Sequence, residues 1–138
     1  MQPFTDVDVL DLTQSIAGPV STQLLASLGA DVVKLEPPEG DAFRDLIDGA
    51  MFASVNLGHK RSICLDLTTD DGRRAARALA ADADVVVQSF RPGVVERFDL
   101  DYASVRERND DVVYCSLSGF GQAGPYADRP AYDPVIQA

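Results

Sequence analysis

The chain has 138 residues, 46% of them hydrophobic, which is enough for one globular domain with a core of its own. Acidic residues outnumber basic ones by 22 to 12, and the formal net charge of −10 disfavours nucleic acid and anionic membranes as partners. Because no apolar run approaches the roughly 20 residues that span a bilayer, and the N-terminus lacks the pattern of a signal peptide, we expect a cytoplasmic protein without a membrane segment.

Residues 7–41 predict a strand, a loop, a helix, a second strand and a second loop. The alternation in VDVLDL and the apolar run in ADVVKLE are typical of strands. Between them, Pro19 suits a first helical turn, and three leucines follow at helical spacing, Leu24, Leu25 and Leu28. A unit of this length predicts a right-handed parallel crossover, with the loops SIAGP and EPPEGD at the ligand-facing edge of the sheet.

The rest of the chain continues to alternate strands and helices. A mixed stretch over residues 40–56 predicts a surface excursion with one short helix, and Thr68 or Thr69 can cap the helix that opens with two aspartates. The segment DVVVQSF is nearly all apolar, which predicts a strand buried on both faces. After residue 56 we expect strands over 61–67, 84–90 and 111–121, helices over 70–83 and 102–109, and the first turn of a helix over 133–138.

This order of elements predicts an α/β domain, an open and mostly parallel sheet with helices on its faces. The last predicted helix stops after one turn, which is too short to bury a face. We therefore expect residues 1–138 to be the N-terminal part of a larger domain.

The charged residues are unusual in kind. Eighteen of the acids are aspartates, they are spread along the chain without an acidic tail, and only Lys34 and Lys60 are lysines. Such a surface predicts a halophilic protein, because high salt screens the repulsion among carboxylates. An ordinary acidic cytosolic protein is the alternative interpretation.

Several common catalytic and metal-binding patterns are missing. No G-x-G-x-x-G follows a strand, no P-loop is present, and SLSGFG is not a nucleophile elbow. His59 has no second histidine or aspartate partner in view, which predicts a solvated loop residue. Cys64 and Cys115 each lie in an apolar, strand-like run without metal-type spacing, so we expect two buried free thiols, no disulfide and no metal site.

The few basic residues form two groups near the expected ligand edge. Lys60 and Arg61 precede one strand, while Arg91 and Arg97 follow another. Surface ion pairs are one interpretation of each group. In a protein this acidic, a local positive group also indicates a phosphate site, which predicts a phosphorylated small molecule as ligand.

Five blocks of the chain resemble a known family in order and spacing. They are VLDLT…AGP, LLASLGADVVKLEPPEGD, NLGHKRSICLDL, DADVVVQSFRPGVVERFDLDY and VYCSLSGFGQAGPYADRPAYDPVIQA. From near Val9 to Ala138 the sequence resembles the family III CoA-transferases (CaiB/BaiF), the group of formyl-CoA transferase, carnitine CoA-transferase and alpha-methylacyl-CoA racemase. The resemblance implies a Rossmann-like large domain, of which residues 1–138 are the incomplete N-terminal part, a smaller second domain and an interlaced homodimer.

The resemblance also implies where coenzyme A binds. Ala17 and Leu65 match positions whose backbone lines the adenine–ribose region, and Phe90 and Arg97 match positions along CoA and at its phosphates. Tyr132 matches a residue near the pantetheine arm. CoA or acyl-CoA is expected as a substrate, with no tightly bound cofactor.

Two positions depart from the family pattern. Pro37 stands where several relatives have an arginine for CoA, and Thr68 stands where several have a lysine. The resemblance therefore does not transfer phosphate contacts to these two positions.

The chemistry implied by the resemblance is CoA transfer between an acyl-CoA and a carboxylic acid. An aspartate attacks the thioester to form a mixed anhydride, and backbone N–H groups of glycine loops stabilise the oxyanions. In relatives this aspartate lies beyond the last block, so we expect no catalytic residue in this chain.

The racemase branch of the family offers a different reaction. It has a histidine before the aspartate of the A-Y-D motif; here that position is Tyr132, and a phenol is a poor base at neutral pH. This favours transferase over a racemase-type acyl-CoA isomerase. A non-catalytic truncated remnant and a small flavodoxin-like binding module are two further interpretations, and the block matches disfavour the second.

Overall fold

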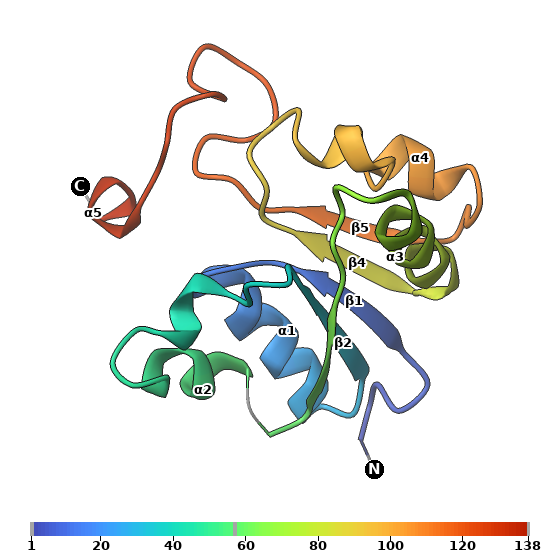
Figure 1. Cartoon of the computed structure of the whole chain (residues 1–138), viewed down its shortest axis with the longest axis horizontal. Coiled ribbons are helices and arrows are strands. Elements are labelled where there is room, and N and C mark those ends of the chain that lie inside the picture. Colours follow the sequence, from blue (N-terminus) through green and yellow to red (C-terminus); the bar gives the residue numbers. More distant parts are fainter. Residues whose placement is uncertain (1, 57, 138) are drawn as a thin grey trace.

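The computed structural model describes residues 2–56 and 58–137. Its centre is one sheet in which every neighbouring pair of strands is parallel, in the order β3-β2-β1-β4-β5 (Figure 1). The strands are β1 (Asp8–Leu12), β2 (Asp31–Glu36), β3 (Lys60–Cys64), β4 (Val85–Gln88) and β5 (Val113–Ser116). The predicted open, Rossmann-like α/β sheet is confirmed. The chain moves outward from β1 in one direction and then in the other, which makes the β1–β4 boundary a topological switch point.

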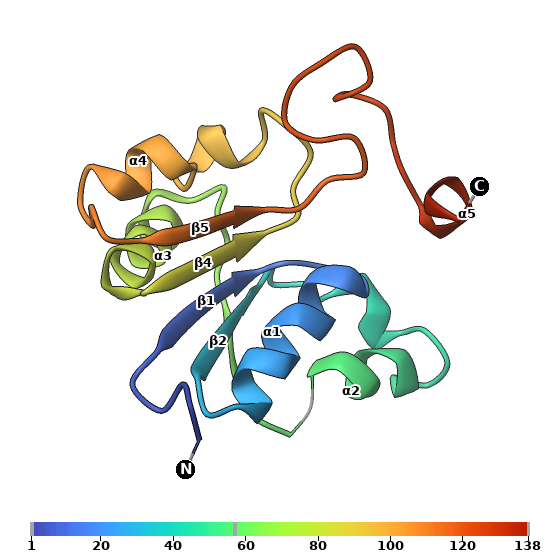
Figure 2. The ribbon, with the colours of Figure 1, turned by 180° about the vertical axis from the view of Figure 1, so that it is seen from behind.

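Helices cover both faces of the sheet (Figures 1 and 2). On one face lie α1 (Ala17–Ser27) and α2 (Ala50–Asn56), and on the other lie α3 (Asp70–Asp82) and α4 (Tyr102–Arg106). The short elements are the 3-10 helices η1 (Ala42–Arg44) and η2 (Val95–Phe98) and the final turn α5 (Asp133–Ile136). Of the two predicted caps, Thr69 is the one that begins α3, since its Oγ1 accepts from the Gly72 N–H at 3.1 Å.

The core lies in two layers because alternate side chains of each strand face opposite sides of the sheet. On the α1 side, the buried cluster is Val9, Ala26, Ala30, Val32 and Val87. On the α3 side, the buried cluster includes Leu10, Leu12, Leu35, Ala76, Ala80, Val86, Leu100 and Val105.

The face of α1 that meets the sheet is made of small residues. Gly18, Thr22 and Ala26 are buried at four-residue spacing, whereas Leu24 is 60% exposed and Leu28 is 44% exposed. A Cβ at position 18 would lie 2.3 Å from the Cβ of Thr13, so only glycine allows this close approach. The helix is where the sequence predicts it, but two of its three leucines point away from the core.

The two cysteines differ from expectation. Both are free thiols, but Cys64 and Cys115 are exposed, so the prediction of burial is wrong. The reason is strand order, because β3 and β5 form the two edges of the sheet in the described residues. A strand-like apolar segment indicates a strand but does not indicate whether that strand is central.

The segment after β5 extends away from the body of the domain. Figures 1 and 2 both show α5 standing apart, beyond the carboxyl ends of the strands. Its aromatic side chains are exposed, among them Phe120, Tyr126 and Tyr132. No helix in residues 2–56 and 58–137 is long and apolar enough to cross a bilayer.

Candidate functional site

A pocket of about 320 Å³ lies at the carboxyl ends of the strands, where open parallel sheets bind their ligands. It receives side chains from β1 and β2 and from the loops after β1, β2, β3 and β4. Its lining residues are Leu12, Gln14, Leu35, Pro37, Pro38, Glu39, Leu65, Asp66, Leu67, Thr68, Phe90 and Phe98. The lining is mostly apolar and ringed by polar groups, which suits a small molecule with an aromatic or alkyl part.

The two loops predicted at this edge contribute unequally. Pro37, Pro38 and Glu39 of the second loop line the pocket. From the first loop, Gln14 reaches the pocket, and its backbone N–H donates to Ser89 Oγ at 3.0 Å. Ser15, next in that loop, has a φ of 68°, a left-handed conformation that turns the chain sharply into α1.

The structure gathers some of the predicted CoA-binding residues and separates others. Leu65 and Phe90 line the pocket, and Phe90 packs against Phe98 with ring centroids 6.2 Å apart. Arg97 is exposed beside Phe98. Ala17 is exposed at the start of α1, outside the pocket lining, and Tyr132 lies on the segment that leaves the domain, 71% exposed. The roles of these five residues toward CoA stay predictions.

A buried ionic cluster lies under the loops, and reasoning from the sequence did not predict it. It contains both lysines of the chain, Lys34 and Lys60, with side chains 2% and 1% exposed. Lys60 Nζ lies 3.1 Å from Asp11 Oδ2 and also donates to the carbonyl of Pro19 and to Asn56 Oδ1. Lys34 Nζ donates to the carbonyl of Thr13 at 2.6 Å and lies 3.2 Å from Asp41 Oδ2.

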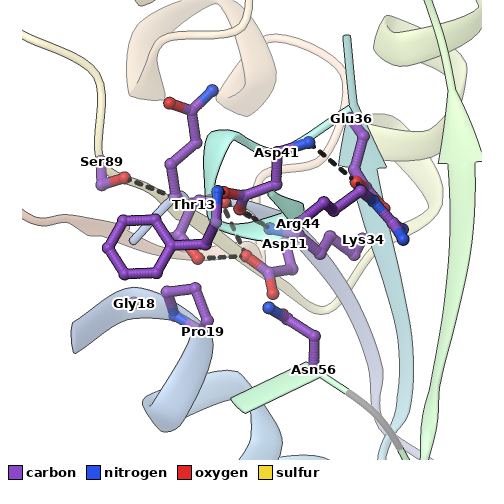
Figure 3. A network of polar contacts seen from close by, with 12 residues as sticks. Asp11, Thr13, Gly18, Pro19, Lys34, Glu36, Asp41, Arg44, Asn56 and Ser89 are labelled. Carbon is purple, nitrogen blue, oxygen red and sulfur yellow. Dashed lines mark hydrogen bonds and ion pairs between the residues drawn. The ribbon is translucent and has the colours of Figure 1, made fainter. Parts of the chain in front are cut away.

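Asp11 is the centre of the cluster (Figure 3). Its carboxylate accepts from Thr13 N at 2.9 Å, from Thr13 Oγ1 and from Thr22 Oγ1 at 2.6 Å. Burial alone would raise the pKa of Asp11, but the ammonium groups of Lys34 and Lys60 and the two threonine hydroxyls hold the pKa below its usual value. Burial lowers the pKa of Lys60, against the opposing effect of Asp11.

Glu36 and Arg44 extend the cluster toward the second loop. Two parallel bonds of 2.6 Å join the guanidinium to the carboxylate, which also accepts from Ser62 Oγ and from Asp41 N. Burial would raise the pKa of Glu36, but the hydrogen bonds from Arg44, Ser62 and Asp41 lower it to about 2. The whole cluster holds three cations and three carboxylates, Lys34, Lys60, Arg44, Asp11, Asp41 and Glu36.

This charge balance overturns the prediction of a phosphate site at Lys60 and Arg61. Lys60 is buried and fully engaged, and Arg61 pairs with Asp31 at 2.6 Å near the amino ends of the strands, at the opposite edge. Arg91 and Arg97 follow β4 and are exposed, and within residues 2–56 and 58–137 no ion pair joins either to a carboxylate. One signal was available in the sequence: an acidic protein with only two lysines has one of them, Lys34, inside a predicted strand.

The fold is a parallel α/β domain with a pocket at the carboxyl ends of its strands, next to the topological switch point. The model of one family, CoA-transferase family III, matches residues 4–138, and the chain belongs to that family. It is 44% identical over 152 residues to succinyl-CoA:mesaconate CoA-transferase of Haloarcula hispanica, covering 100% of this chain and 38% of the relative. It is 40% identical over 148 residues to succinate–glutarate CoA-transferase of Agrobacterium fabrum, covering 98% of this chain and 37% of the relative.

Solved structures agree with the sequence comparison. A CaiB/BaiF family protein from Brucella suis superposes with a TM-score of 0.93 at 42% identity, covering 99% of this chain and 38% of that one. The chain therefore has the family fold over nearly its whole length. It spans well under half of the length of these relatives.

Proposed function

We propose that this chain is the CoA-binding, N-terminal part of a longer family III CoA-transferase, which moves CoA between an acyl-CoA and a small carboxylic acid. The observation that carries the proposal is the pocket at the switch point, which Leu65 and Phe90 both line in a member of this family. The two CoA-transferase relatives act, by their names, on succinyl-CoA, mesaconate, succinate and glutarate, which makes small carboxylic acids the acceptors to test first.

The cations near the pocket differ in whether they are free to bind the phosphates of CoA. Lys34, Lys60 and Arg44 are neutralised by buried carboxylates, so they have no spare charge for an anion. Arg97, exposed beside Phe98, is the cation best placed to bind a phosphate in an acidic protein. Phe90 and Leu65 offer apolar surface for the adenine.

The covalent chemistry belongs to residues outside this chain. In the proposed reaction, an aspartate carboxylate attacks the thioester carbonyl, the C–S bond breaks, and CoA leaves as a thiolate while an aspartyl mixed anhydride forms. The thiolate attacks the aspartyl carbonyl of this anhydride, which releases the donor acid and leaves an aspartyl–CoA thioester. The acceptor carboxylate attacks that thioester, giving a second mixed anhydride and free CoA thiolate. The thiolate finally attacks the acceptor carbonyl of this anhydride, which forms the new acyl-CoA and regenerates the aspartate. Tyr132, 71% exposed and one residue before α5, is the residue that we assign to the pantetheine arm.

A racemase-type acyl-CoA isomerase is the second candidate within the family. That reaction needs a base that removes an α-proton, and Tyr132 stands at the relevant position. Exchange of the α-proton of a 2-methylacyl-CoA in deuterium oxide, without CoA transfer, would establish the racemase. Transfer of CoA from succinyl-CoA to an acid, without α-exchange, would establish the transferase.

Salt adaptation, a cytoplasmic location and an interlaced homodimer are further parts of the proposal. Both lysines are buried, so the exposed cations of the described residues are arginines, on a surface rich in aspartate. Unfolding temperature should rise with potassium chloride concentration up to the molar range, because the ions screen carboxylate repulsion. A temperature that is independent of salt would contradict this part.

CoA binding is tested by titration calorimetry on the protein that contains this chain. Arg97→Ala should weaken CoA affinity about tenfold, the loss of one charge-assisted contact. Arg108→Ala is the control, because Arg108 is exposed near the end of α4, away from the pocket lining. An unchanged affinity in Arg97→Ala would remove that residue from the site, and no binding by the parent protein would refute the CoA proposal.

A further inference from the structure

We propose that Lys34 is a positioning residue for CoA binding, which ties the loop after β1 to the loop after β2 and so sets the shape of the pocket. The inference rests on the proposed function, because it assigns to CoA the pocket that these loops line. Lys34 does not itself line the pocket. Its side chain points to the α1 face of the sheet, as its strand neighbour Val32 does, and the adjacent Leu35 lines the pocket.

The two contacts of Lys34 belong to different loops. Its Nζ donates to the carbonyl of Thr13, the first residue after β1, at 2.6 Å. It also lies 3.2 Å from Oδ2 of Asp41, at the end of the loop after β2. The two partners are separated by a helix and a strand in sequence, so one buried ammonium holds together two segments that are distant along the chain.

Each partner adjoins residues that line the pocket. Thr13 is flanked by Leu12 and Gln14, and the Gln14 N–H extends the connection to Ser89, one residue before Phe90. On the other side, Asp41 follows the lining residues Pro37, Pro38 and Glu39. The Lys34 ammonium therefore connects the backbone of one lining loop, at Thr13, to the Asp41 side chain at the end of the other.

Asp41 is in turn held in one place by two more bonds. Its N–H donates to Glu36 Oε2 at 3.1 Å, and its Oδ1 accepts from Phe43 N at 2.9 Å, which begins η1. A shift of the Lys34 ammonium therefore moves both walls of the pocket. Ordering of these walls before the ligand arrives raises affinity, because less entropy is lost on binding.

Lys60 makes a different set of contacts in the same cluster. Its Nζ joins Asp11 on β1, the carbonyl of Pro19 in α1 and Asn56 Oδ1 at the end of α2. These groups belong to a strand and two helices, and none of them lines the pocket. Lys60 thus stabilises the packing of helices on the sheet, while Lys34 connects the loops. The two lysines provide an internal comparison at similar burial.

Removing the charges of Lys34 and Asp41 together separates the effect of Lys34 on the loops from its effect on stability. Lys34→Met keeps most of the volume but leaves the Asp41 carboxylate buried without its cation, which is destabilising. Adding Asp41→Asn removes that charge and keeps an oxygen to accept from Phe43 N, so the double variant should regain stability. The tie between the loops stays broken in the double variant.

The experiment compares Lys34→Met, Lys34→Met/Asp41→Asn and Lys60→Met in the protein that contains this chain. Urea denaturation measures stability, calorimetry measures CoA affinity, and amide hydrogen exchange without ligand measures the order of residues 13–16 and 39–41. We expect the double variant to be more stable than Lys34→Met yet to bind CoA about tenfold more weakly than the parent, with faster exchange in both loops. Lys60→Met should lose stability and, where folded, keep its affinity within about twofold.

Two results would overturn the proposal. One is a stable double variant with the affinity and loop exchange of the parent, because Lys34 would then be a structural residue only. The other is a fully folded Lys60→Met variant that loses as much CoA affinity as the double variant. Contact between Lys34 and the two loops would then not explain the loss of affinity. If the parent protein binds no CoA, the proposed function fails by itself, and exchange in the two loops still decides whether Lys34 orders them.

Discussion

The two ends of the parallel strands hold their charges in different ways. Toward the carboxyl end, the ammonium groups of Lys34 and of Lys60, whose backbone begins β3, are buried, and each lies within 3.2 Å of an aspartate oxygen. At the amino end, Arg61 and Asp31 are as close, at 2.6 Å, but their side chains are 68% and 49% exposed. A buried charge that loses its partner stays away from water, whereas an exposed one is rehydrated. Burial, more than distance, therefore decides what an ion pair contributes in this protein.

The largest expected effect comes from removing the centre of the buried cluster. Asp11→Ala leaves the Lys60 ammonium buried without its carboxylate and should lower the free energy of unfolding by about 3–5 kcal/mol, measured by urea denaturation. Asp31→Ala removes a carboxylate from the other end and should cost less than about 1 kcal/mol. Equal losses in the two variants would show that burial does not distinguish the two ends.

The contribution of Glu36 to the free energy of unfolding should depend on pH. Its pKa falls from 4.5 to about 2 on folding, so the folded state binds the proton less readily than the unfolded state. The contribution of Glu36 to stability is therefore complete above pH 4.5 and is lost as the pH falls from 4.5 toward 2. Glu36→Gln should cost about 1.5–3 kcal/mol at pH 7, through the weakened bonds to Arg44 and Ser62.

The check is the urea midpoint of both proteins between neutral and acidic pH. The difference between parent and Glu36→Gln should narrow below pH 4.5, as the parent carboxylate takes up its proton. If the urea midpoints of the two proteins instead fall in parallel down to acid pH, a group other than Glu36 causes the loss of stability in acid.

A steric change tests how closely α1 approaches the cluster. In Gly18→Ala, the new methyl would lie 2.3 Å from the Thr13 Cβ, so Thr13 must move and its bonds to Asp11 must lengthen. Overpacking of this kind should cost about 1–3 kcal/mol in thermal or urea unfolding. Ser27→Ala, on the exposed surface of the same helix, is the control and should change stability by less than about 0.5 kcal/mol. A neutral Gly18→Ala would mean that the helix can shift without disturbing the cluster.

The smallest effect is expected at the amino end. Arg61→Ala breaks the exposed pair with Asp31 and should change stability by less than about 1 kcal/mol. The change should shrink further as salt is added, since exposed charges are screened. A loss comparable to that of Asp11→Ala would refute the distinction drawn between the two ends.

Local sequence signals predicted most of the fold. The run of three valines in β4 indicates a buried strand without reference to the rest of the chain. Thr69, followed by two aspartates, begins α3 through contacts within one helical turn. Local signals failed for the burial of side chains that depends on which strands are neighbours in the sheet. Cys64 and Cys115 lie in strands as expected, but strand order places them at the edges.

The candidate site was partly predictable for a related reason. The family resemblance pointed to Leu65 and Phe90, and in the structure each follows a parallel strand that ends at the same edge, so both line one pocket. Arg97 and Tyr132 lie further along the chain from the ends of β4 and β5. The position of a strand does not determine where a loop residue at that distance lies. Lys34 occupies an ordinary strand position, and nothing around it in the sequence points to Asp41 or Thr13.

The order of strands and helices, the parallel sheet and the edge at which a ligand would bind can all be derived from the amino-acid sequence. These features follow from periodicity, caps and crossover handedness, which act over a few residues or one strand–helix–strand unit. The partners of the two lysines and the face of α1 that meets the sheet became apparent only in the folded chain. Lys60 and Asp11 are 49 residues apart in the chain and Lys34 and Thr13 are 21 apart, so folding, and not local sequence, brings each of these buried lysines to its partner.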